Sequence, residues 1–333
     1  MPTKNQQVLL AARPVGAPKE SDFRVVETEL RDPADGEVLV KNLYLSLDPY
    51  MRGRMSEAKS YAKSLELGEV MIGGTVGEVV ASRHAKLAVG DLVVGMLGWQ
   101  RYGVATGQGL MKVDASRIPA SAYLGAVGMP GVTAWYGLTE IGAPKAGETL
   151  VVAAASGAVG SVVGQLAKLR GCRAVGIAGG ADKCAHVVRD LGFDACLDHR
   201  APDLEAQLRD ATPDGIDIYF ENVGGAILDL VLARLNPFAR IPLCGLVSQY
   251  NATSAYGVKN FASLLTNRVT LRGFIVSEHM DRWPAALAEL GTLVAEGRLK
   301  HRESVTEGLA NAPKAFIGML EGANFGKTVV KLT

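Results

Sequence analysis

The segment Ala155 to Gly160 constrains the fold of this chain more than any other stretch. It reads ASGAVG, a Gly-x-Gly-x-x-Gly fingerprint with alanine in the first glycine position. The pattern predicts a buried strand before it at residues 149–154, an amphipathic helix after it at 161–170, and a second strand at 173–177. This order predicts a βαβ unit that lays a pyrophosphate on the N-terminus of the helix.

The small residues of this unit have separate expected roles. Gly157 lets the backbone turn and approach the phosphates, with Ala158 and Val159 completing the turn, and Gly160 and Gly164 let the helix lie close to the sheet. The alternative is a helix whose small residues serve packing alone. The flanking strands favour the binding unit.

The end of the second strand bears on which dinucleotide binds. A unit that binds NAD usually has Asp or Glu there, about 20 residues after the glycines, to bond the ribose 2′-hydroxyl. This chain has glycines at 179 and 180, followed by Lys183, which suits a 2′-phosphate. Asp182 is interpreted as a helix N-cap, and His199 and Arg200 as flanking the adenosine end. The pattern favours NADPH over NADH.

Composition sets broad limits. The 333 residues suggest two domains, and a formal net charge of +1 gives no indication of binding to nucleic acid or an anionic membrane. The N-terminus does not resemble a signal peptide, and no apolar run approaches the ~20 residues that a membrane span needs. We expect a soluble, cytoplasmic protein.

Neither cysteines nor histidines are spaced as metal ligands. The four cysteines form no Cys-x-x-Cys pair and are interpreted as buried thiols without disulfides (Cys172, Cys184, Cys196, Cys244). The five histidines are scattered. We therefore expect no metal site.

The pattern of predicted secondary structure changes twice along the chain. Residues 1–127 contain short alternating runs separated by Gly, Pro and Asp turns, which predict an all-β, barrel-like domain. In residues 128–299 strands alternate with helices, and residues 300–333 return to short strands that rejoin the first domain. The six strands predicted in the middle region form a doubly wound parallel sheet (149–154, 173–177, 195–197, 217–221, 239–243, 270–275). A substrate cleft is expected between the two domains.

Several longer motifs then become recognisable. The chain resembles the zinc-independent medium-chain dehydrogenases/reductases, with a Rossmann domain and a GroES-like barrel, and within them the prostaglandin reductase and alkenal double-bond reductase group. The motifs that carry the resemblance run in order along the chain: YLSLDPYMRGRM from Tyr44, GMPGVTA from Gly128, AAASGAVGSVVGQLAKLRGC from Ala153, ENVGG from Glu221, CGLVSQYNAT from Cys244 and NFGK from Asn324.

The resemblance implies roles by matching position. The turn at Gly157, Ala158, Val159 and Gly160 would hold the pyrophosphate, and Lys183 the 2′-phosphate. The remaining positions implied to bind the cofactor are Asn222, Cys244, Gly245, Ser248, Tyr250, Phe274, Val276 and Asn324. Tyr50 and Met129 are implied to face the substrate. Tyr250 is also implied to be catalytic, next to the substrate carbonyl.

The chain departs from the family in two places. His199 stands where some relatives have a tyrosine near the adenosine phosphate, and Thr266 stands where the mammalian enzymes have a tyrosine, so Thr266 is assigned no chemistry. The zinc-dependent relatives have a Gly-His-Glu segment where this chain has Gly73, Gly74 and Thr75. That difference agrees with the expected absence of a metal.

The implied reaction is reduction of a carbon–carbon double bond conjugated to a carbonyl. Hydride reaches the β-carbon, negative charge develops on the carbonyl oxygen, and a donor aimed at that oxygen stabilises it. Tyr250 is the candidate donor, directly or through the nicotinamide ribose, and solvent or the tyrosine protonates the α-carbon. Its alternative role is packing, whereas for Tyr50 packing and substrate contact remain equally open.

Two other functions remain open. One is a carbonyl or quinone reductase of the same fold, and the other is an NADPH-binding protein without enzymatic activity. The substrate class is also open among curcumin-like dienones, 2-alkenals and lipid enones. The resemblance also implies a homodimer, formed through the edge of the nucleotide-binding sheet, for which the apolar strand at residues 269–276 is the candidate.

Overall fold

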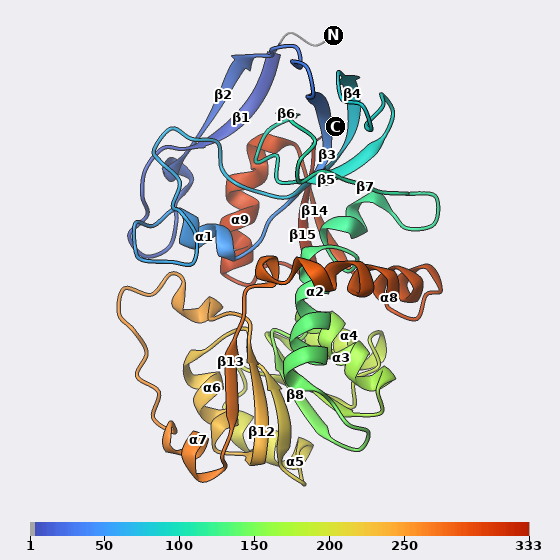
Figure 1. Cartoon of the computed structure of the whole chain (residues 1–333). Helices are drawn as coiled ribbons and strands as arrows, with labels where there is room; N and C mark the ends of the chain where they lie inside the picture. Colours follow the sequence, from blue (N-terminus) through green and yellow to red (C-terminus); the bar gives the residue numbers. More distant parts are fainter. Residues whose placement is uncertain (1–3, 333) are drawn as a thin grey trace. The chain divides into compact units, whose positions relative to one another are not determined.

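The computed structural model describes residues 4–332. They divide into two compact units (Figure 1). Unit 1 comprises the chain up to Gly125 and again from Glu303 onward, and unit 2 comprises Ala126–Arg302. Each unit has its own hydrophobic core, so each is described separately.

Unit 2 is built on a six-stranded sheet in the order β10-β9-β8-β11-β12-β13. All five strand pairs are parallel. The strands are β8 (Thr149–Ala153), β9 (Arg173–Ala178), β10 (Ala195–Asp198), β11 (Ile216–Phe220), β12 (Leu235–Leu243) and β13 (Thr270–Gly273). The prediction of a parallel sheet with six strands is confirmed.

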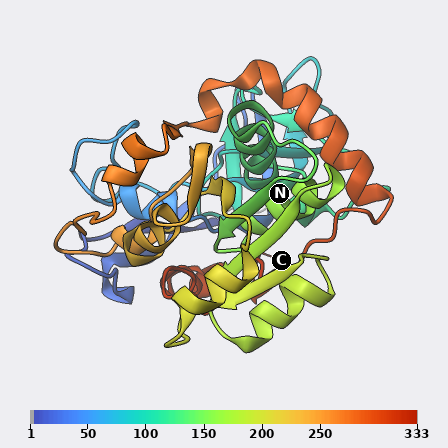
Figure 2. The same cartoon turned by 90° about the horizontal axis from the view of Figure 1, so that it is seen from below.

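Helices cover both faces of this sheet because alternate strand residues point to opposite sides. Leu150 and Val152 of β8 belong to the core on the side of α2, α3 and α8, whereas Val151 and Ala153 belong to the core on the side of α5 and α6. Figure 2 shows these two layers in the turned view. The helices of unit 2 are α2 (Met129–Tyr136), α3 (Gly160–Leu169), α4 (Ala181–Arg189), α5 (Leu204–Ala211), α6 (Gly225–Leu232), α7 (Ala262–Thr266) and α8 (Trp283–Ala295).

Unit 1 is rich in strands. Its larger sheet has the order β14-β15-β3-β4-β5-β7, with β6 also paired to β3, and β1 pairs with β2 in a separate ribbon. The strands are β1 (Lys4–Leu10), β2 (Phe23–Glu29), β3 (Val38–Ser46), β4 (Thr75–Ser82), β5 (Leu92–Gly95), β6 (Tyr102–Ala105), β7 (Met111–Lys112), β14 (Glu303–Glu307) and β15 (Lys327–Lys331). The return of the C-terminal strands to this sheet is explained by the pairing of β15 with β3.

Unit 1 also contains two helices that the sequence pattern did not predict, α1 (Tyr50–Arg54) and α9 (Ala312–Leu320). Phe316 of α9 is fully buried against Trp99, with ring centroids 5.6 Å apart, and Phe23 stacks on Trp99 at 5.7 Å. The helix α9 is therefore part of the core of unit 1.

One prediction about the cysteines is wrong. Cys172 is buried, but Cys184, Cys196 and Cys244 are only partly buried. Cys184 lies in the surface helix α4, Cys196 in the edge strand β10 and Cys244 directly after β12, so each is less enclosed than a residue of a central strand.

Candidate active site

The turn between β8 and α3 holds the fingerprint. Strand β8 ends at Ala153, one residue earlier than predicted, because Ala154 adopts the left-handed conformation with φ of 54°. A Cβ atom on Gly160 would lie 2.3 Å from the carbonyl oxygen of Ala154, so the turn requires glycine there. The N-cap of α3 is Val159, whose hydrocarbon side chain offers no acceptor to the N–H groups of the first turn. A phosphate group supplies that acceptor, so the turn fits a pyrophosphate.

Gly164 has a different neighbour from the one predicted. An added Cβ would lie 1.8 Å from Cζ of Phe193, which is located between α4 and β10. The close approach allowed by Gly164 is thus to this segment rather than to the sheet. The reason is that Gly164 lies on the side of α3 that meets the segment after α4.

Basic side chains surround the tip of β9. A Cβ on Gly179 would lie 2.7 Å from Nε2 of His199, so this ring lies directly against the glycine. Burial lowers the pKa of Lys183, and the nearby positive charge of Arg200 lowers it further. Lys183 and Arg200 thus place two positive charges near the end of β9. The tip therefore fits a phosphate group.

Two carboxylates, Asp198 and Asp182, lie near the tip of β9. Asp198 at the end of β10 accepts hydrogen bonds from the N–H groups of Gly180 (2.9 Å) and Arg200 (3.0 Å), which hold its pKa below the usual range. The prediction that Asp182 is the N-cap of α4 is wrong. Gly180 is the N-cap, at φ of 100°, and Asp182 lies exposed in the first helical turn. Asp198 was not predicted, although its place at a strand end was the available signal.

The loops after β11 and β12 bring together several of the predicted cofactor residues. Asn222 donates from Nδ2 to the carbonyl of Ala153 at the end of β8 (2.9 Å). The N–H groups of Cys244 and Gly245 donate to the carbonyl of Glu221 at 2.9 and 3.1 Å. Three neighbouring strand ends are thus joined at the carboxyl edge of the sheet, where α/β folds bind ligands.

Tyr250 and Ser248 belong to the same edge. Ser248 donates from Oγ to the carbonyl of Val223 (2.6 Å), and the Tyr250 hydroxyl accepts a long bond from the N–H of Leu246 (3.4 Å). An added Cβ on Gly245 would lie 3.2 Å from the same hydroxyl. The Tyr250 ring is therefore folded back over the loop that follows β12.

Three further predicted residues are placed mainly by packing. Phe274 is buried against Phe220 and Tyr136, with ring centroids at 6.4 and 5.5 Å, and Val276 is 8% exposed. Their side chains therefore belong to the core of unit 2. Met129 begins α2 and packs against the same core.

Tyr50 and Asn324 lie in unit 1. Tyr50 begins α1, and its buried hydroxyl makes no hydrogen bond within the described part of the chain. Burial, followed by the charge of Asp48, raises the pKa of Tyr50. Asn324 donates from Nδ2 to the carbonyl of Gly326 (2.8 Å), in the loop between α9 and β15. The Tyr50 hydroxyl is a polar group in need of a partner, which agrees with its proposed contact with substrate.

A buried ion pair supports these two segments. Nζ of Lys327 lies 2.9 Å from Oδ1 of Asp48 and donates to the carbonyl of Leu47 at 2.6 Å, and Ser46 donates to the same carboxylate. Lys327 is 4% exposed and Asp48 5%. Nothing local in the sequence marks this pair, because its two partners are 279 residues apart.

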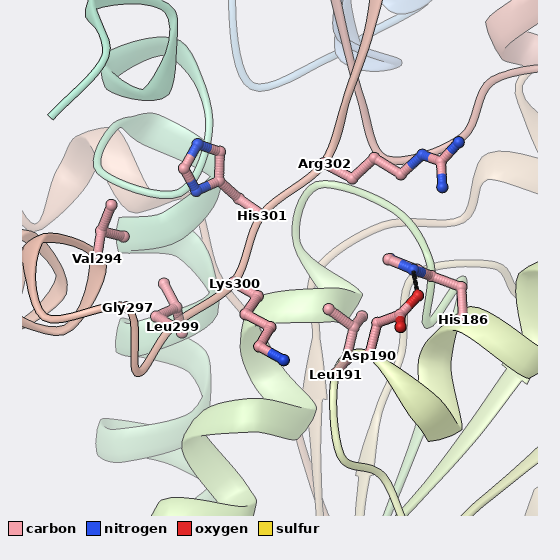
Figure 3. A pocket seen from close by; sticks show the side chains of 9 residues that line it. All are labelled: His186, Asp190, Leu191, Val294, Gly297, Leu299, Lys300, His301 and Arg302. Atoms are coloured by element: carbon pink, nitrogen blue, oxygen red, sulfur yellow. Dashed lines mark hydrogen bonds and ion pairs between the residues drawn. The ribbon is translucent and has the colours of Figure 1, made fainter.

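A cavity of 560 Å³ lies elsewhere on unit 2 (Figure 3). It contains the pair His186 and Asp190, with Nδ1 and Oδ2 2.6 Å apart, and none of the predicted site residues. The side chains of Lys300, His301 and Arg302 extend in different directions there. Their charges do not converge on one position, so this cavity is a poor match for the cofactor.

Among residues 4–332 no cluster of three or more His, Cys, Asp or Glu side chains is arranged to bind a metal ion. In the same range, none of the helices combines the length and the apolar character that crossing a membrane requires.

Comparisons with known proteins identify the family. Residues 6–113 match the family described as N-terminal domain of oxidoreductase, and residues 158–292 match the family described as zinc-binding dehydrogenase. The chain is 50% identical to the NADPH-dependent curcumin reductase of Escherichia coli (strain K12), with 99% of this chain and 97% of the relative covered. It is 43% identical to the 2-alkenal reductase (NADP(+)-dependent) of Nicotiana tabacum, with 99% and 98% covered.

The fold agrees with these relationships. The crystal structure of CurA in complex with NADPH from Vibrio vulnificus matches with a TM-score of 0.94 and 51% identity, with 98% of this chain and 99% of that chain covered. The chain therefore belongs to the zinc-independent medium-chain dehydrogenases/reductases, in the group that contains the prostaglandin reductases and alkenal double-bond reductases.

Proposed function

We propose that this protein is an NADPH-dependent reductase of carbon–carbon double bonds conjugated to a ketone or aldehyde. The observation that carries the proposal is similarity over nearly the whole chain to an NADPH-dependent curcumin reductase and a 2-alkenal reductase. The glycine turn after β8 and the basic tip of β9 support it, because the turn fits a pyrophosphate and the tip fits the 2′-phosphate that NADPH has and NADH lacks.

The residues of this chain have defined tasks in that reaction. NADPH, when bound, supplies the hydride that is added to the β-carbon. Negative charge then develops on the carbonyl oxygen of the substrate, and the Tyr250 hydroxyl stabilises it, directly or through the nicotinamide ribose. Tyr50 and Met129 line the substrate position, and Asn222 and Asn324 hold the nicotinamide side. Solvent or Tyr250 protonates the α-carbon.

One incubation tests this function against its alternatives. The protein is mixed with NADPH and an α,β-unsaturated ketone, and the nicotinamide absorbance and the products are followed. We expect absorbance loss with formation of the saturated ketone. An allylic alcohol would instead indicate a carbonyl reductase, turnover of quinones alone would indicate a quinone reductase, and binding without turnover a non-enzymatic protein. Extending the product screen to curcumin-like dienones, 2-alkenals and lipid enones then defines the substrate class.

The choice of NADPH over NADH depends on Lys183. We expect Lys183→Ala to weaken NADPH binding by about 10- to 150-fold, because a charge-assisted phosphate contact contributes ~1.5–3 kcal/mol. NADH has no 2′-phosphate, so its affinity should change little. Fluorescence titration of both cofactors measures the effect. The matched control is Lys168→Ala, which removes a lysine paired with Asp194 (2.8 Å) outside the site. Equal losses for both cofactors would show that Lys183 does not contact the 2′-phosphate.

We also propose that the protein is a homodimer. Strand β13 is an edge strand of the unit 2 sheet, its four residues are exposed, and Leu271 is 40% exposed. A second copy of the chain that pairs along this edge would cover its open N–H and C=O groups. We expect light scattering to give the mass of a dimer, and Leu271→Asp to give a monomer. A native monomer at micromolar concentration would contradict the proposal.

The other partners follow from the same reasoning. The expected partner is a small unsaturated carbonyl compound rather than nucleic acid or a membrane. We propose a cytoplasmic location, supported by four free cysteines, since thiols stay reduced in that compartment. Fractionation of cells followed by immunodetection tests the location.

A further inference from the structure

Glu221, directly after β11, is a fully buried carboxylate that the mechanism above does not use. We propose that Glu221 is a positioning residue that holds the two loops on the nicotinamide side of the site, residues 222–225 and 244–248, in their binding conformation. This inference rests on the proposed function, since it concerns the same site.

The carboxylate shapes the first loop. Its Oε1 atom accepts hydrogen bonds from the N–H groups of Val223 (2.5 Å) and Gly224 (2.9 Å). The two glycines that follow, Gly224 and Gly225, adopt φ of 75° and 62°. Glycine can adopt many backbone conformations, at positive and at negative φ. The two hydrogen bonds to Oε1 select one conformation of this loop.

The backbone of the same residue shapes the second loop. The carbonyl of Glu221 accepts from the N–H groups of Cys244 and Gly245, and the carbonyl of Asn222 accepts from Val247 at 3.1 Å. The carbonyl of Val223 accepts from the N–H of Ser248 at 3.0 Å. Backbone hydrogen bonds therefore hold residues 244–248 against residues 221–223. Tyr250 lies just after the second of these segments.

The environment of the Glu221 carboxylate indicates that its role is to accept these hydrogen bonds. Burial raises its pKa, and the N–H groups of Val223 and Gly224 oppose that rise. The buried Tyr219 hydroxyl lies near the carboxyl group and also opposes the rise, although neither this hydroxyl nor Oε2 makes a hydrogen bond of normal geometry among residues 4–332. In that part of the chain, the groups that oppose the rise are hydrogen-bond donors rather than cations. Burying a carboxyl group without a cationic partner is unfavourable. Packing alone therefore does not explain why a glutamate occupies this position.

The test uses variants at one position. Glu221→Ala removes the acceptor, whereas Glu221→Gln keeps an oxygen in the place of Oε1. Glu221→Asp keeps a carboxylate but withdraws it by one methylene group, and it replaces the Ala variant if the latter does not fold. The matched control is Val231→Ala, which opens a cavity in the core of unit 2 and removes no side-chain hydrogen bond.

Three quantities are measured: NADPH affinity by fluorescence titration, the single-turnover rate of enone reduction, and the melting temperature. We expect Glu221→Ala to weaken NADPH binding ~10-fold and to slow single turnover ~10- to 100-fold, because small misplacement of reacting groups has effects of that size. The ratio of NADPH to NADH affinity should stay unchanged, since the adenosine end is not altered. Glu221→Gln should recover both quantities to within ~3-fold, and Val231→Ala should lower only the melting temperature.

Two results would overturn the inference. In the first, Glu221→Ala or its Asp replacement behaves as Val231→Ala does, with lower stability but normal affinity and turnover. In the second, Glu221→Gln is as impaired as Glu221→Ala. If the native protein binds NADPH but reduces no enone, the proposed function fails, and the NADPH titrations of the same variants still decide the role of Glu221.

Discussion

Tyr250→Phe is expected to lower kcat by ~10- to 1,000-fold, the range found when a single donor to a developing oxyanion is removed. The substitution keeps the ring that folds over the loop after β12 and removes only the hydroxyl near Gly245 and Leu246. Because the contact to the carbonyl oxygen strengthens as charge develops, NADPH affinity should change little. Steady-state kinetics on a simple enone, combined with fluorescence titration of NADPH, measure both effects.

Tyr50→Phe is the comparison for this experiment. The Tyr50 hydroxyl is buried in unit 1 without a hydrogen-bond partner among residues 4–332, so its removal should not disturb the fold. If Tyr50 only lines the substrate position, its loss should raise KM and leave kcat nearly unchanged. A primary isotope effect with deuterated NADPH first establishes that hydride transfer limits the rate. Full kcat for Tyr250→Phe under that condition would exclude Tyr250 as the donor.

Lys327→Met is expected to give the largest loss of stability. It removes the cation from a buried pair and leaves the Asp48 carboxylate, 5% exposed, with Ser46 as its remaining side-chain donor. Removing one partner of a buried ion pair typically lowers the free energy of unfolding by ~3–5 kcal/mol. Urea unfolding followed by far-ultraviolet circular dichroism measures the change. The effect should appear in the transition of unit 1, which contains both residues.

The matched control for this pair is Lys331→Met on the same strand. Lys331 pairs with Glu307 at 3.5 Å, and both side chains are exposed, so its loss should change the free energy of unfolding by less than ~1 kcal/mol. The double variant Asp48→Leu with Lys327→Met should regain part of the lost stability, because no buried charge then remains. Equal effects of the two lysine substitutions would show that the pair involving Lys327 is not stabilising.

Local pattern was enough to predict the sheet of unit 2. A strand buried on both faces is a continuous apolar run, as in residues 149–153, and each such run is followed by a helix with apolar spacing. These signals lie within about ten residues of one another, so neighbouring residues determine them. The errors there concern strand ends. Strand β8 ends early because Ala154 adopts a left-handed conformation that no residue pattern announced, and β12 begins at Leu235, four residues before the predicted position 239.

The candidate site contains some residues that the sequence could predict and others that it could not. The glycine turn, Lys183 and the motif containing Tyr250 were recognisable from residue type and spacing, and their roles remain predictions for the experiments above. The partners that hold them were not recognisable. Glu221 contacts the segment at 244–245 only because parallel strands bring their carboxyl ends to one edge.

Sequence by itself therefore determined the class of fold and the family, since these depend on short-range periodicity and on contiguous motifs, and it predicts the positions that bind phosphate groups. Tertiary structure alone decided the helices of unit 1, the facing of Gly164 toward Phe193, and the pairing of Lys327 with Asp48. Each of these depends on contacts between residues far apart in the chain. Such contacts are selected by the burial of apolar surface and the need to satisfy buried polar groups, and neither is visible in a short window of sequence.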